Sequence, residues 1–267
     1  MLYFARPRKK TGGTTIGEVL RQAWGRLIHK QWLIIYPLAL AVIHSLAFLA
    51  VYTASGEPIR LTEFFTANFE RWAYVREHFL TGFSFTPELG VAVFAGLAVC
   101  LLGAMIRAPF FRAVVGRTYP LAPRSWEEVA RLTVFYLFVN LVVWVMPLAT
   151  PAGSLLEQLG SMVALVVALL VVFTDYVIVY ENQPVPGALR RGLRLLSRRW
   201  PTVLVIFVVV QLVMTGLSRL YRLYYEGTTE IFVLLPLSQL LVEALIVLFV
   251  DLVLIFLYEQ IRRTLPS

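Results

Sequence analysis

The sequence predicts an all-α, polytopic integral membrane protein with six transmembrane helices. Apolar residues make up 59% of the 267 residues and charged residues only 15%, whereas soluble domains are about 45–50% apolar and about 25% charged. The mean hydropathy of +0.75 indicates the same class. Six apolar runs also approach the roughly 20 residues that ~30 Å of hydrocarbon requires. Together these observations exclude a soluble enzyme or a soluble binding domain.

The chain is expected to begin with a basic cytoplasmic tail, residues 1–15, followed by a single membrane domain, residues 16–267. Thr15 and Glu18 have the spacing of a capping box, which predicts the start of an amphipathic helix. The basic residues of that helix are Arg21, Arg26 and Lys30. We expect them to contact anionic lipid or a partner at the membrane interface.

The apolar runs predict the spanning helices in order. They lie at residues 32–52, 91–111, 132–147, 162–180, 202–217 and 231–258. The first run is expected to be an uncleaved helix, because the residues before it are too many for the charged start of a signal peptide. Residues 53–88 form a long aromatic outer loop, with a helix expected near residues 60–79 on the outer interface.

Loop charges predict the orientation. Nineteen of the 24 lysines and arginines fall on one side of this topology. By the positive-inside rule both termini are cytoplasmic, and we expect the chain in a bacterial cytoplasmic membrane. The formal charge of +8 is then mostly this loop bias, so a nucleic-acid partner is not expected.

A basic helix is predicted between the fourth and fifth spans. Its apolar residues Leu189, Leu193, Leu196 and Trp200 recur at helical period. Its arginines lie beside this stripe and are expected to contact anionic headgroups or a partner. They are Arg190, Arg191, Arg194, Arg198 and Arg199.

This helix resembles an earlier part of the chain. Residues 26–30 align with residues 194–198, and each basic helix leads into an apolar run. Ser125 and Glu128, a second capping box, start a shorter third copy. The sequence therefore predicts three units of interfacial helix plus transmembrane hairpin.

Two segments carry a family resemblance. Asp175–Trp200, with its carboxylate, polar turn and Ala-Leu-Arg-Arg helix, and Gly17–Trp24 (GEVLRQAW) resemble bacterial six-helix membrane domains of the glycerophosphodiester-phosphodiesterase membrane-domain type. The resemblance covers roughly residues 15–55 and 170–220. In some relatives this domain precedes a phosphodiesterase domain, for which this chain has no room. The resemblance thus implies a fold and not a catalytic activity.

Polar side chains inside the predicted spans are the candidate functional residues, because such groups are costly in hydrocarbon unless they are paired. They are Asp175, Glu243, Asp251, Asn140, Gln211 and His44. Together they predict a polar path through the bundle. The structural alternative is that Asp175 and Asp251 pair with Arg190, Arg194 or Arg262, and that Glu243 hydrogen-bonds Gln211 or Asn140.

Other site chemistry is not expected. The sequence has three separate histidines, one cysteine, and no zinc-protease, nucleophile-elbow, P-loop or dinucleotide motif, so no metal, cofactor or catalytic residue is predicted. It also shows no pair of obviously interrupted helices of the kind that marks a transporter site.

The favoured hypothesis is a non-enzymatic scaffold or accessory subunit whose basic helices contact anionic lipid or a membrane protein partner. The alternative is a small transporter or lipid-handling protein that uses the intramembrane carboxylates, and a membrane-embedded enzyme is the third option.

Overall fold

A computed structural model describes residues 16–54, 87–116, 124–148, 155–227 and 234–264. Over these residues the chain is helical and has no strands, which confirms the predicted all-α class. The predicted basic tail and the predicted outer helix near residues 60–79 lie outside the described residues.

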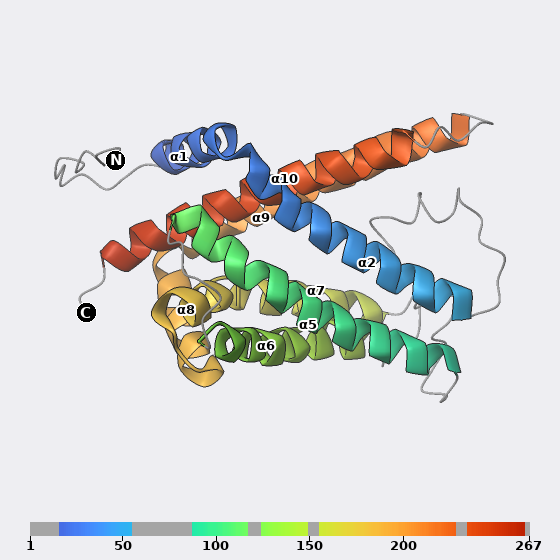
Figure 1. Cartoon of the computed structure of the whole chain (residues 1–267), viewed down its shortest axis with the longest axis horizontal. Helices are drawn as coiled ribbons and strands as arrows, with labels where there is room; N and C mark the ends of the chain where they lie inside the picture. Colours follow the sequence, from blue (N-terminus) through green and yellow to red (C-terminus); the bar gives the residue numbers. More distant parts are fainter. Residues whose placement is uncertain (1–15, 55–86, 117–123, 149–154, 228–233, 265–267) are drawn as a thin grey trace.

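The described helices are shown in Figure 1. They are α1 (Ile16–His29), the 3-10 turn η1 (Gln31–Ile34), α2 (Ile35–Ala54), α5 (Pro87–Val115), α6 (Arg124–Leu148), α7 (Leu155–Leu170), α8 (Thr174–Glu181), α9 (Val185–Gly227) and α10 (Leu234–Arg263).

Four helices of the described chain are long and apolar enough to cross a membrane. They cover Gln31–Ala54, Leu89–Val115, Val185–Tyr221 and Ser238–Arg263. They confirm membrane-length helices at four of the six predicted positions and indicate a membrane protein. The six-helix count and the threefold repeat stay predictions.

The fourth predicted span, residues 162–180, is not one continuous helix. Helix α7 ends at Leu170, residues 171–173 form a turn, and α8 begins at Thr174. The turn keeps local hydrogen bonds, with the Thr174 amide donating to the Val171 carbonyl at 2.9 Å. Helix α8 is short and ends where Asn182 adopts a left-handed backbone with φ of 54°, a conformation that asparagine tolerates better than most residues.

The predicted arginine helix is the first part of α9 and not a separate element. Arg199, with φ of −139° and ψ of 25°, breaks the helical geometry just before Pro201, so α9 bends there. Proline removes a backbone donor and clashes with the preceding turn, which accounts for the bend.

The predicted apolar stripe is divided between the inner and outer faces of this helix. Leu196 is buried and Leu189 packs against the main core, whereas Leu193 and Trp200 are 42% and 52% exposed, as expected for residues in the acyl boundary. The approach to α8 is close: a Cβ at Gly192 would lie 2.9 Å from the Thr174 hydroxyl oxygen and 3.3 Å from the Thr174 backbone nitrogen. A small residue makes this helix contact possible, as is common between membrane helices.

The second predicted capping box is also wrong. Helix α6 begins at Arg124, so Ser125 already lies inside it. The Glu128 carboxylate forms an ion pair with Arg112 of α5. Glu128 therefore joins two helices and does not cap one.

Helix α1, α8, the start of α9 and the C-terminal turn of α10 lie at the same end of the bundle, here called the basic end (Figure 1). The main core includes this end and contains Phe111, Phe173, Tyr176 and Tyr258. A smaller, separate core joins α2 and α5 towards the opposite end, around Phe48 and Tyr52.

Candidate functional site

Arg107 of α5 is the centre of a buried ion cluster. One guanidinium nitrogen lies 3.2 Å from the Asp175 carboxylate and the other lies 3.8 Å from the Asp251 carboxylate. The two carboxylates come from α8 and α10, so the cluster ties together three helices that are far apart in sequence. The predicted pairing of Asp175 and Asp251 with arginines at the basic end is wrong, because both carboxylates pair with Arg107 of α5 instead.

Asp175 is firmly held. Arg107 donates to its Oδ2 at 3.2 Å, the Tyr176 amide donates to its Oδ1 at 2.9 Å, and the Tyr136 hydroxyl lies 3.5 Å from Oδ2. The break before α8 puts this carboxylate in the first turn of a helix, where backbone N–H groups point towards a negative charge. The turn between α7 and α8 thus explains how the Asp175 carboxylate is accommodated inside the bundle.

Asp251 is held more loosely. Its contact with Arg107, at 3.8 Å, is beyond hydrogen-bond distance. With both carboxylates ionised, the cluster carries two negative charges against one positive charge. The surplus charge is therefore nearest to Asp251.

A cavity of about 440 Å³ lies next to the cluster. Helices α2, α5, α6 and α10 contribute to its wall, together with the break between α7 and α8. Arg107, Asp175 and Asp251 retain 26%, 9% and 11% of their side-chain exposure, which they direct to this space. The aromatic rings of Phe135, Tyr136 and Tyr176 also line it.

The cavity brings together four of the six predicted intramembrane candidates. Asp175, Asp251, Asn140 and His44 all line it. The Asn140 amide donates to the sulfur of Cys100, another lining residue, at 3.0 Å. Convergence of four predicted residues, from four helices, makes this cavity the candidate functional site.

The other two candidates lie elsewhere. Gln211 is exposed on α9, and Glu243 is half-buried on α10, about two turns from Asp251. Neither is among the residues that line the cavity. The Asn140 amide, one predicted partner of Glu243, donates its hydrogen bond to the sulfur of Cys100.

The predicted basic contacts fall into two groups. Arg21, Arg190, Arg194, Arg198 and Arg199 are exposed. The others take part in contacts within the bundle.

Arg191 pairs with Glu181 at 3.4 Å, and the Arg26 guanidinium carbon lies 6.0 Å from the ring centre of Phe256. The Lys30 ammonium donates to the Ala113 carbonyl at 2.9 Å. Burial, and then repulsion from Arg26, lower the pKa of Lys30. These three side chains therefore hold helices together, and the five exposed arginines are the ones available to a headgroup.

Sequence reasoning missed Arg107, Tyr136 and Tyr176. Arg107 was counted among the basic loop residues, although it lies eight residues before the end of α5. Arg107 could have been identified as an arginine inside an uninterrupted apolar run, because two other predicted spans each carry an aspartate. Charges of opposite sign at similar depth are expected to meet.

No described group of three or more histidine, cysteine or acidic side chains has an arrangement suited to a metal ion. No family model, no curated protein and no solved structure matches the chain. The resemblance to six-helix membrane domains stays a prediction, and function has to be argued from the cavity itself.

Proposed function

We propose that the chain is a small transporter or membrane-embedded binding protein whose substrate carries a positively charged group, such as an ammonium. The observation that supports this most is the cavity beside Arg107, Asp175 and Asp251, where two carboxylates face one guanidinium group. A charge left unbalanced inside hydrocarbon is costly. A bound cation, or a proton taking its place, removes that cost.

The other lining residues suit the same ligand class. Phe135, Tyr136 and Tyr176 offer aromatic faces, and ammonium groups bind well over such faces when water is excluded. A volume of about 440 Å³ falls within the range of about 300–1,000 Å³ typical of small-molecule sites. In this proposal Asp251 contacts the cation, while Arg107 and Asp175 fix the wall behind it.

The broken helix supports movement of the substrate and not only its binding. Val171 and Val172, in the turn between α7 and α8, line the cavity. Transporters place discontinuous helices at their substrate sites, and a turn at membrane depth is tolerated where it lines a cavity. A scaffold has no need for such a turn.

The scaffold hypothesis is the second candidate. It is favoured by Arg190, Arg194 and Arg198 of α9, which are exposed, recur every four residues on one side of the helix and are suited to anionic headgroups. It requires no ligand in the bundle. The two hypotheses therefore differ in whether the cavity binds a cation.

The test is thermal unfolding of the purified protein with three cations, tetramethylammonium, ethanolamine and tetraphenylphosphonium, at constant ionic strength. A ligand at about 100 times its Kd stabilises a protein by about 2.7 kcal/mol. We expect such a shift with at least one of the cations and none with phosphate or acetate.

Asp251→Asn is the decisive variant. Arg107 keeps its 3.2 Å partner Asp175 in this variant, so a neutral pair remains and the fold is retained. The cation shift should disappear. Glu259→Gln is the matched control, because Glu259 lies on the same helix but pairs with Arg262 and Arg263 outside the cavity. If no cation raises the unfolding temperature of the wild-type protein, the scaffold hypothesis is favoured. If a cation still raises the unfolding temperature of Asp251→Asn, Asp251 is not part of the cation site.

A further inference from the structure

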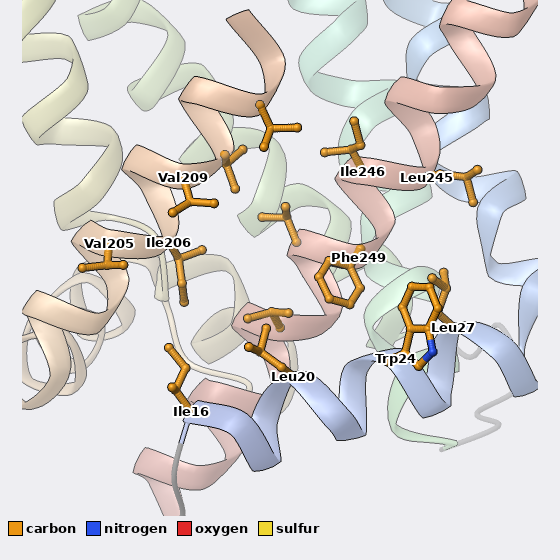
Figure 2. A pocket seen from close by; sticks show the side chains of 14 residues that line it. Ile16, Leu20, Trp24, Leu27, Val205, Ile206, Val209, Leu245, Ile246 and Phe249 are labelled. Carbon is orange, nitrogen blue, oxygen red and sulfur yellow. The ribbon is translucent and has the colours of Figure 1, made fainter. Parts of the chain in front are cut away.

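A second hollow lies at the basic end, away from the ion cluster. Helices α1, α9 and α10 enclose a groove of about 650 Å³ (Figure 2). Its lining includes Trp24 of α1, Val209 of α9 and Phe249 of α10, and no polar atom faces it. The edge-to-face contact of Trp24 with Phe249, at 6.1 Å between ring centres, joins two of its walls.

The groove opens to the surroundings of the bundle. Trp24, Val205 and Val209 line it and are 57%, 56% and 52% exposed. Helices α9 and α10 are both of membrane-spanning length, so this open side faces lipid in a bilayer. A wholly apolar hollow is a poor site for water, and the molecule that reaches it from the side is apolar.

Helix α1 limits what fits. It crosses the end of the groove below α9 and α10, with Leu20 and Trp24 directed into it (Figure 2). A partner helix that spans the membrane needs about 20 residues of uninterrupted length and would run into α1. An acyl chain, which enters from the bilayer and ends under α1, does not meet this obstacle.

Exposed arginines lie on the helices that form the groove. Arg198 and Arg199 are exposed at the bend of α9, about two turns before the groove-lining Val205. Arg21 is exposed on α1, one residue after the groove-lining Leu20. Because guanidinium groups match phosphate oxygens in geometry and charge, these arginines are suited to the headgroup of a lipid whose acyl chain occupies the groove.

We propose that this groove is a binding site for one acyl chain of an anionic phospholipid, with the lipid phosphate held by Arg198 and Arg199. The site is separate from the cavity beside Arg107 and does not depend on the function proposed for that cavity. It specifies where the anionic lipid binds and which side chains select it.

The experiment is native mass spectrometry of the full chain with phosphatidylglycerol and phosphatidylcholine of identical acyl chains. We expect one tightly retained phosphatidylglycerol. Arg198→Gln with Arg199→Gln should weaken phosphatidylglycerol by about 10–30-fold, because each arginine near an anionic headgroup contributes about 1 kcal/mol. Phosphatidylcholine should weaken less, because its choline group offsets the charge of the phosphate. Added salt should reduce the preference.

The groove is tested by Val209→Trp, which fills it and should weaken both lipids. Leu212→Trp is the matched control: Leu212 lies on the same helix, is 68% exposed and does not line the groove. Equal binding by the two variants overturns the proposal, as does equal affinity of the wild-type chain for both lipids. A dimer that retains no lipid and is disrupted by Val209→Trp would show that a second copy of the chain occupies the groove, and would also overturn the proposal.

A second measurement covers the case in which Val209→Trp does not fold. Phosphatidylglycerol with a photoreactive group in the acyl chain should crosslink wild-type protein at Trp24, Val209 and Phe249. Crosslinks spread evenly over the other lipid-facing helices would show ordinary boundary lipid and contradict a specific site.

Discussion

Replacing Arg107 with methionine tests the ion cluster most directly. The variant leaves Asp175 and Asp251 close together without the cation that both contact. At an effective dielectric constant of about 20, a charge pair at 3.2 Å is worth about 5 kcal/mol and one at 3.8 Å about 4 kcal/mol. Because the unpaired carboxylates can take up protons, the net loss is smaller than this total. We expect destabilisation of about 3–5 kcal/mol, the usual result of removing one partner from a buried ion pair.

The assay is thermal unfolding in detergent, monitored by tryptophan fluorescence. The expected loss corresponds to a fall in Tm on the order of 10 °C. The triple variant R107M/D175N/D251N removes every charge of the cluster and should unfold close to the wild-type temperature, because neutral replacement of buried ion pairs is often tolerated. An Arg107→Met variant that melts like the wild type would refute the cluster as a stabilising unit. A triple variant as unstable as the single one would show that lost packing, and not charge, sets the effect.

Two further predictions concern the contacts that position the site. Gly192→Leu should lower the stability by about 1–3 kcal/mol in the same unfolding assay, because the new side chain forces α8 and α9 apart. The control Gly216→Ala, in the same helix with no neighbour within 4 Å of a new Cβ, should be neutral or slightly stabilising. Equal losses for the two variants would mean that the close approach of α8 and α9 is unimportant. Glu128→Gln should lower the stability by about 1–3 kcal/mol in chemical denaturation, because it weakens a largely buried ion pair with Arg112. Glu127→Gln removes an exposed ion pair with Arg131 and should lower the stability by under about 0.5 kcal/mol. A larger loss for Glu127→Gln would contradict this order.

Four of the six predicted spans coincide with helices of membrane length, because hydropathy detects long apolar runs. Four of the predicted candidates also meet in one cavity, since polar side chains in hydrocarbon have few alternatives to one another. Asp175 and Asp251 were identified by chain position alone, and the structure adds Arg107 as their common partner.

The break between α7 and α8 was not predictable in the same way. Residues 171–173 are Val-Val-Phe, with no glycine or proline to mark an interruption. Hydropathy measures only whether a run is apolar and not whether its backbone is continuous. The break therefore depends on tertiary contacts, such as those of Asp175 with Arg107 and Tyr136.

The face that the arginine helix turns to the bundle was only partly predictable. In a membrane the lipid side is apolar as well, so an apolar stripe at helical period does not distinguish the two sides: Leu193 and Trp200 face outwards, whereas Leu196 is buried. Gly192 carries a clearer signal for the contact with α8, because a small residue permits the close approach.

The division of the core into two clusters has a consequence for how the bundle moves. The larger cluster includes parts of α1, α5, α6, α8, α9 and α10, while the cluster of Phe48 and Tyr52 joins α2 to α5. Helices α2 and α5 make the most extensive contact between any two helices of the described chain, so the pair is expected to move as one unit and not to open at its own seam. The cavity beside Arg107 is lined by Val99 of the smaller cluster and by Phe135 and Tyr176 of the larger one. A movement of the α2–α5 pair against the larger cluster would therefore change the shape of the cavity.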